Sequence, residues 1–254
     1  MYLGYKGVGL TVDHGVLSPL DPDWRREAER VRGLLERHQQ HSVIETGARF
    51  LLDPRRKHQP TLLSPSADER KVRLDFLGRC AELARLLGAD AVSFWSGSAV
   101  DDAEPEILWQ RLTAGCHRLL EIADGVPLAF EPEPGMFVDT MTRFEELGRR
   151  MGTDDLGLAL DIGHLHCQGE TPIADRIRQW AEPLRVVHID DMRTGVHDHL
   201  MFGDGEIDFP PVLAALDEVG YWGGVFVELS RHSHDAVRTA QCSFDFLRDP
   251  SRNR

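Results

Sequence analysis

Short apolar segments and longer amphipathic segments alternate along the whole chain, and this rhythm constrains the fold more than any other feature. Strands are predicted at 3–12, 42–45, 91–95, 128–131, 156–161, 184–189 and 225–229. Helices are predicted between them at 23–40, 67–87, 104–123, 140–151, 172–180 and 209–219. Strands that alternate with helices form parallel sheets joined by right-handed crossovers. The pattern therefore predicts an α/β fold.

Two architectures accommodate repeated strand–helix units: an open doubly wound sheet and a closed eight-stranded barrel. Seven strands are evident, and a weak eighth is predicted at 199–202. Eight units over 254 residues average about 32 residues each, which suits the roughly 250 residues usual for a (β/α)8 barrel. No Gly-x-Gly-x-x-Gly follows the first strand, so no nucleotide cofactor is expected. We predict a TIM barrel with a single domain spanning residues 1–254.

The residue pattern inside two strands favours the barrel directly. In the strand at 156–161, the three leucines share one face, while Gly157, Ala159 and Asp161 share the other. Glu131 ends the equivalent row of the strand before it. A barrel strand needs bulky residues outward and size-matched residues in its narrow interior. The polar residue that ends each inward row is placed where TIM barrels keep their chemistry.

Composition excludes several classes of partner. The chain has 29 Lys plus Arg against 42 Asp plus Glu, a formal net charge of −13, which disfavours binding to nucleic acid. No apolar run approaches the roughly 20 residues that span a bilayer, so no membrane association is expected. The first residues resemble no secretion signal, and we expect cytoplasmic residence. The expected partner is a small-molecule substrate, and a homo-oligomer is compatible with the exposed faces of a barrel.

Four predicted strands finish in a side chain that can bind a metal: Glu131, Asp161, His188 and Glu228. They are separated by 30, 27 and 40 residues, so each falls one strand–helix unit after the last and all point into the barrel mouth. Three carboxylates brought together without a cation would cost several kcal/mol. We predict one divalent ion, with Mn²⁺, Mg²⁺ or Co²⁺ favoured and Zn²⁺ also accommodated. Glu133 is the second choice for the fourth ligand.

Further polar residues follow the predicted strand ends. Arg193 and Arg49 are candidates to bind a substrate carboxylate or phosphate. Trp95 is a candidate wall of the substrate pocket, and His14 is a weaker candidate for substrate contact. The basic run at 55–58 fits a solvated loop better than a binding site.

Five segments carry a resemblance to a known family: FEPEPG (130–135), LDIGHLH (160–166), VHIDD (187–191), FGDGEIDF (202–209) and VELS (227–230). Over about residues 128–230 the chain resembles the xylose isomerase-like TIM-barrel superfamily. This group includes sugar-phosphate isomerases and epimerases, ketose 3-epimerases, inosose dehydratases and endonuclease IV. The resemblance implies the same four metal ligands, and it implies that Glu131 and Glu228 also serve as a catalytic acid/base pair.

The resemblance also bears on three histidines. It places His164 in a loop after Asp161 as a substrate-binding residue. His197 and His199 fall where endonuclease IV has an Asp-x-His pair that helps to bind a further zinc, so His164, His197 and His199 are a candidate second metal site. A plain polar loop is the alternative. Glu45 and Trp95 stand where endonuclease IV has histidines, which leaves its three-metal arrangement incomplete.

The resulting hypothesis is a metal-dependent isomerase or epimerase of a small sugar, sugar phosphate or related polyhydroxy carbonyl compound. It would act through an enediolate, with Glu131 and Glu228 as the acid/base pair. The substrate would be bound by His164, Arg193, His199 and Trp95. A dehydratase of a cyclitol-type substrate is the first alternative, and a phosphoester hydrolase is the less favoured second. A barrel that binds a metabolite without turnover is the non-enzymatic alternative.

Overall fold

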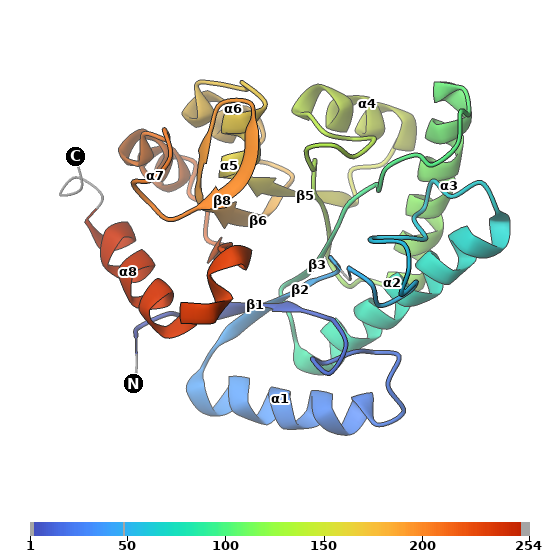
Figure 1. Ribbon diagram of the computed structural model, residues 1–254, viewed down its shortest axis with the longest axis horizontal. Helices are drawn as coiled ribbons and strands as arrows, with labels where there is room; N and C mark the ends of the chain where they lie inside the picture. Colours follow the sequence, from blue (N-terminus) through green and yellow to red (C-terminus); the bar gives the residue numbers. More distant parts are fainter. Residues whose placement is uncertain (1–2, 48, 250–254) are drawn as a thin grey trace. The chain divides into compact units, whose positions relative to one another are not determined.

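The computed structural model describes residues 3–47 and 49–249 (Figure 1). The chain divides into two compact units. The first unit comprises residues 7–158, and the second comprises residues 3–6 and 159–249. Strand β5 (Leu156–Asp161) contributes to both, because the boundary falls after Leu158.

The first unit is built on parallel strands in chain order. These are β1 (Gly7–Thr11), β2 (His41–Glu45), β3 (Ala91–Phe94), β4 (Leu128–Phe130) and the start of β5. Thr11 pairs with Glu45, and Glu45 pairs with Ser93, so the carboxyl ends of the strands are aligned. Residues that directly follow the strands, such as Trp95 and Glu131, therefore lie along one edge of this sheet.

The helices of the first unit are α1 (Trp24–His38), α2 (Ala67–Leu87), α3 (Pro105–Ala123) and α4 (Met141–Met151). Helix α2 begins where the Ser66 side chain accepts a hydrogen bond from the Glu69 N–H, and it ends at Gly88 in the left-handed conformation. It packs on β2 and β3 and against the neighbouring helices α1 and α3 (Figure 1). Its buried face includes Phe76, Leu77 and Cys80. This packing buries the apolar stripe that the sequence predicts.

In the second unit, β6 (Leu184–Ile189) pairs in parallel with β9 (Val225–Val227). The connecting and flanking helices are α5 (Ile162–Cys167), α6 (Ile173–Gln179), α7 (Phe209–Glu218), a 3₁₀ helix η1 (Ser230–Asp235) and α8 (Ala236–Arg248). Between β6 and α7 the chain forms a hairpin of β7 (Asp191–Arg193) and β8 (Val196–Leu200), which pair antiparallel.

The seven evident strands and six helices of the sequence prediction are confirmed, whereas the strand found near the weak eighth segment does not join the parallel strands. Residues 196–200 form β8, which pairs with β7 in a separate two-stranded sheet. The hairpin turn passes through Gly195, whose φ of 72° favours glycine. Because this turn joins two adjacent short strands, β8 pairs locally. The sequence prediction also omits α5 and α8.

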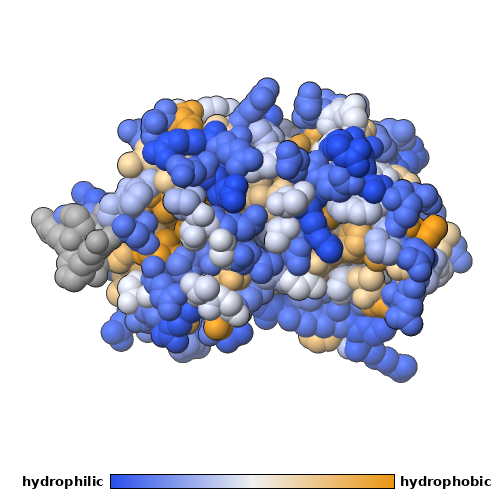
Figure 2. Space-filling view, turned by 90° about the horizontal axis from the view of Figure 1, so that it is seen from above, coloured by the Kyte–Doolittle hydropathy of each residue, from blue (hydrophilic) through white to orange (hydrophobic). Residues whose placement is uncertain are grey.

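The surface in view is mostly polar. Figure 2 shows hydrophilic side chains over most of this face, with apolar ones in small scattered groups. Among the described residues, no helix combines the length and the apolar character needed to cross a membrane.

Candidate functional site

Asp161 occupies the junction between a buried strand and a short helix. It is the last residue of β5, all of which is buried, and it caps the N-terminus of α5. Its Oδ1 accepts a hydrogen bond from the backbone N–H of His164 at 2.9 Å. The Asp-x-x-His spacing is therefore a helix cap, and His164 lies in α5 rather than in the loop that the sequence predicts.

Asp161 meets His188 and Glu228 in the second unit. His188 is the penultimate residue of β6, and Glu228 directly follows β9. One donor atom from each of the three residues lies within 4.8 Å of the others, and His188 Nδ1 is 3.8 Å from Glu228 Oε2. Metal–ligand bonds of about 2.0–2.6 Å place two donors around one ion at most about 5 Å apart. These three residues are thus spaced for one divalent cation.

The electrostatics of Asp161 favour its charged form. Burial opposes ionisation, but the imidazoles of His164, His199 and His188 and the hydrogen bond from the His164 N–H hold its pKa below the usual range. Its second oxygen, Oδ2, is buried and has no hydrogen-bond partner among the described residues. A buried carboxylate oxygen without a hydrogen bond lowers the stability of the folded state unless a cation binds to it. The donor set therefore fits a metal ion.

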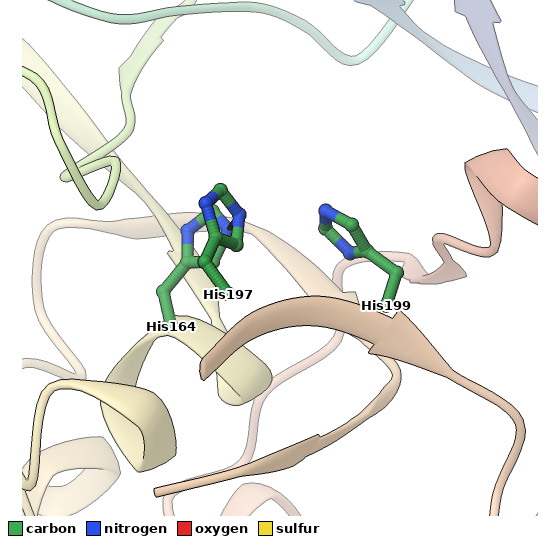
Figure 3. A group of neighbouring side chains, drawn as sticks. All are labelled: His164, His197 and His199. Atoms are coloured by element: carbon green, nitrogen blue, oxygen red, sulfur yellow. Dashed lines mark hydrogen bonds between the residues drawn. The ribbon is translucent and has the colours of Figure 1, made fainter. Parts of the chain in front are cut away.

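Three imidazoles form a second group of donors. His164 of α5 and His197 and His199 of β8 each place a ring nitrogen within 4.8 Å of the other two (Figure 3). The Nε2 atoms of His164 and His197 are 3.1 Å apart. The ring centroids are 4.8–5.9 Å apart. His197 and His199 lie on strand β8 of the hairpin rather than in the plain polar loop that was the alternative to a second metal site.

Asp190 directly follows β6 and is fully buried. Its Oδ2 accepts a hydrogen bond from Nδ1 of His199. Burial and the charge of Asp161 raise the pKa of Asp190. Burial alone would lower the pKa of His199, but the hydrogen bond to Asp190 and the charge of Asp161 raise it above its usual range.

Asp191 anchors the loop that follows the hairpin. Its carboxylate accepts hydrogen bonds from the backbone N–H groups of Gly203, Gly205 and Ile207 at 2.8, 3.0 and 3.1 Å. A Cβ at Gly205 would lie 2.2 Å from Asp191 Oδ1. The glycine is therefore required by the close approach of this carboxylate.

In the first unit, Glu131 directly follows β4 and is 5% exposed. Its backbone N–H donates to the carbonyl of Phe94 at 2.8 Å, which fixes its place at the strand end. Glu133 is half-buried, and its N–H donates to the carbonyl of Val138. Trp95 directly follows β3 and is 6% exposed.

Two side chains, those of Arg73 and His58, contact the ring of Trp95. The guanidinium of Arg73, itself 1% exposed, lies 4.6 Å from the centroid of the Trp95 ring. On another side, His58 makes an edge contact at 5.2 Å. Little of the indole is thus accessible, and its role as a pocket wall stays a prediction.

The remaining predicted residues are exposed. Arg193 lies on β7, and its Nη2 donates to the carbonyl of Asp204 at 2.9 Å. Arg49 and His14 lie in exposed loops, where a ring nitrogen of His14 is 3.4 Å from the carbonyl oxygen of Phe50. In the basic run at 55–58, Arg56 pairs with Asp53 and Glu69, each at 2.7 Å. Arg55, Arg56 and Lys57 of this run are exposed, as in a solvated surface segment, whereas His58 is half-buried against Trp95.

Asp190 and Asp191 are not among the site residues that the sequence predicts, although both belong to the segment VHIDD. The available signal is their position directly after His188 and Ile189 at the end of β6. Two consecutive aspartates at a strand end are ordinary loop residues in most proteins. Only the folded hairpin and the loop after it show that Asp190 bonds to His199 and that Asp191 bonds to the backbone of residues 203–207.

A family profile described as "Xylose isomerase-like TIM barrel" matches residues 2–249. The chain belongs to this family. Its TIM-barrel fold agrees with the predicted class, and the parallel strands and alternating helices described above are those of this family.

Curated relatives match over part of their length. An inosose dehydratase from Lacticaseibacillus casei is 30% identical over 139 residues, which cover 47% of this chain and 46% of that protein. An inosose isomerase from Halalkalibacterium halodurans is 31% identical over 158 residues, covering 54% and 56% respectively. The matched segment thus spans about half the length of these curated relatives.

Solved structures share the fold over nearly the whole chain. A 3-keto-D-glucoside 4-epimerase from E. coli has a TM-score of 0.76 at 15% identity, and the match covers 97% of this chain and 90% of that one. The IolI protein with a bound zinc atom has a TM-score of 0.74 at 20% identity, covering 97% and 88%. At these identities the likeness establishes the fold alone.

Proposed function

We propose that this protein is a divalent-metal-dependent isomerase or epimerase of a small polyhydroxy carbonyl compound. One observation carries the proposal: Asp161, His188 and Glu228 converge at strand ends, and a buried oxygen of Asp161 lacks a hydrogen-bond partner among the described residues. Sugar epimerases and inosose enzymes among the similar proteins support this class of reaction.

The first ion would be held by Asp161, His188 and Glu228, with Glu131 as the fourth ligand. Glu131 is assigned from its position at the end of β4, because the carboxyl ends of barrel strands surround a common mouth. The oxygen-rich set favours Mn²⁺, Mg²⁺ or Co²⁺, and it also accommodates Zn²⁺. A divalent ion bound there would act as a Lewis acid that stabilises negative charge on the substrate oxygens.

The two glutamates would move the proton. One removes a proton from the carbon beside the substrate carbonyl, which leaves an enediolate, and the other returns a proton. Return to the neighbouring carbon moves the carbonyl and makes an isomerase. Return to the opposite face of the same carbon inverts it and makes an epimerase. The side chain of Glu228 is 39% exposed, so it is accessible to a substrate.

Substrate hydroxyl groups would be bound by residues around the carboxylates. We assign this role to His164, His199, Arg193 and Trp95. His164 lies 3.7 Å from Asp161 through its Nε2, which places an imidazole beside the proposed first ion. Arg193 uses one nitrogen for the Asp204 carbonyl and keeps further N–H donors for a substrate oxygen. The names of the inosose enzymes and of the 3-keto-D-glucoside 4-epimerase point to cyclic polyhydroxy ketones as the first substrates to test.

A second ion would bind to His164, His197 and His199. Three nitrogen donors without a carboxylate favour Zn²⁺ over Mg²⁺ or Mn²⁺. We therefore propose two sites of different preference, one rich in oxygen and one made of imidazoles.

Product analysis tests the proposed reaction. The protein loaded in turn with Mn²⁺, Mg²⁺, Co²⁺ and Zn²⁺ is incubated with ketoses, sugar phosphates and inososes in D₂O, and the products are followed by NMR. We expect deuterium at the carbon beside the carbonyl together with a moved carbonyl or an inverted centre. An unsaturated ketone would instead establish a dehydratase, and a cleaved ester would establish a hydrolase. No turnover with any metal and substrate would reject the enzyme.

A further inference from the structure

Asp190 lies between α5 and β8, the two elements that carry the proposed ligands of the second ion. It is fully buried, and its Oδ2 accepts the hydrogen bond from Nδ1 of His199 on β8. On the side of α5 it lies against Gly163, where an added Cβ would come within 2.1 Å of Asp190 Oδ1. Gly163 precedes His164 directly. One carboxylate thus contacts both the helix of His164 and the strand of His199.

This hydrogen bond determines which nitrogen of His199 is available. An imidazole has two ring nitrogens, and one that donates its N–H to a carboxylate leaves the other as the metal donor. Because Nδ1 of His199 is bonded to Asp190, Nε2 remains. Figure 3 shows a ring nitrogen of His199 turned toward His197 and His164. The Nε2 atoms of those two residues already approach each other to 3.1 Å.

We propose that Asp190 is a positioning residue of the second metal site. It holds His199 with Nδ1 protonated and Nε2 directed at the other two imidazoles, so that three nitrogens meet at one ion. The inference rests on the second ion of the proposed function and adds to it a residue that acts through His199. Carboxylates that orient a metal-binding histidine in this way commonly contribute 10–100-fold (an order-of-magnitude range) to metal affinity.

Asp190→Asn and Asp198→Asn make a matched pair for the test. Both are aspartate-to-asparagine changes close to His199, but Asp198 pairs with Arg231 of η1 at 2.8 Å. Zinc binding to the full chain is measured by competition with a chromophoric chelator, and manganese binding is measured separately. We expect Asp190→Asn to weaken the second zinc by roughly 10–100-fold and to change manganese affinity by a clearly smaller factor. Asp198→Asn is expected to leave both affinities unchanged.

A second readout needs no variant. Long-range ¹H–¹⁵N spectra of the zinc-loaded wild-type protein report which nitrogen of His199 carries a proton and which binds metal. We expect a protonated Nδ1 and a metal-bound Nε2. A metal-bound Nδ1, or a second zinc that Asp190→Asn binds as tightly as the wild type, would overturn the assignment.

The outcomes also distinguish this inference from the proposed second ion and from the proposed isomerase reaction. A wild-type chain that takes up only one ion would overturn the role of Asp190 together with the second ion. Two bound ions without turnover would reject the isomerase and leave the role of Asp190 intact.

Discussion

The proposed reaction depends on individual carboxylates, and Glu228 is the most exposed of the four proposed ligands of the first ion. Glu228→Gln removes a base while keeping the size of the side chain, so we expect turnover to fall by about 10²–10⁴-fold with the fold retained. Steady-state kinetics with metal content measured in parallel test this. Glu206→Gln, on the exposed loop beside Thr194, is the control and should keep full activity. Near-normal activity of Glu228→Gln would exclude the two-glutamate mechanism.

His58 gives a pH dependence of stability that is independent of the metal sites. Burial, together with the charges of Lys57 and Arg73, lowers its pKa from 6.5 to about 4. Between these values the unfolded chain binds more protons, so the free energy of unfolding decreases as the pH falls from about 6.5 toward 4. Because the side chain is part-exposed, we expect about 1 kcal/mol between pH 7 and pH 5.

The variant that tests this is His58→Asn, since asparagine tolerates the φ of 64° at this position. Urea denaturation of both proteins at pH 5 and pH 7 gives the comparison. The wild type should lose about 1 kcal/mol more than the variant over this interval. Equal losses would show that His58 does not carry the effect.

At the level of elements, the periodicity of apolar residues predicts most strands and helices but not the hairpin or α5. Strand β5 is buried throughout, and α4 and α2 present continuous apolar stripes, so local sequence is sufficient for them. Helix α5 has six residues and depends on its cap by Asp161. The segment VHDHL is compatible with a strand in any sheet. Only its antiparallel pairing with β7 determines which sheet β8 joins.

The same distinction applies to the candidate site. Residues at the ends of regular strands recur in phase with the strand–helix unit, which is why Asp161, His188 and Glu228 were predictable as neighbours. The contact between Asp190 and His199 depends on how the hairpin folds back, and no periodicity encodes it. Arg73 is similar, because its burial against Trp95 follows from helix packing rather than from its own sequence context.

The loop after the hairpin is an element held by one carboxylate, and Gly205→Ala tests it. The new Cβ would lie 2.2 Å from Asp191 Oδ1 and 2.6 Å from the carbonyl of Met192, so the loop must shift. We expect a loss of about 1–3 kcal/mol in the free energy of unfolding. Gly33→Ala is the control, since a Cβ there meets no atom within 4 Å and alanine favours the helix. Chemical denaturation should show stabilisation or no change for this control; similar losses in both variants would refute the steric argument.

At the scale of the whole molecule, the excess of acidic residues leads us to expect that metal binding increases the free energy of unfolding substantially. The formal net charge is −13, and buried carboxylates add to the repulsion that a divalent ion relieves. An ion present at about 100 times its dissociation constant stabilises the folded state by about 2.7 kcal/mol. We expect the Tm to rise with added Mn²⁺ and to return to its starting value with EDTA, as scanning calorimetry would measure.

This metal-induced rise in Tm also decides between the two glutamates that follow β4. Glu131 is buried directly at the strand end, whereas Glu133 is half-buried two residues further along. If Glu131 is the fourth ligand, Glu131→Gln replaces an anionic donor by a weak neutral one and should remove most of the rise. Glu133→Gln makes the same chemical change beside it and should keep the rise intact. Both proteins are compared without metal first, so that any intrinsic loss of stability is subtracted. A rise that survives in Glu131→Gln and disappears in Glu133→Gln would reassign the ligand to Glu133.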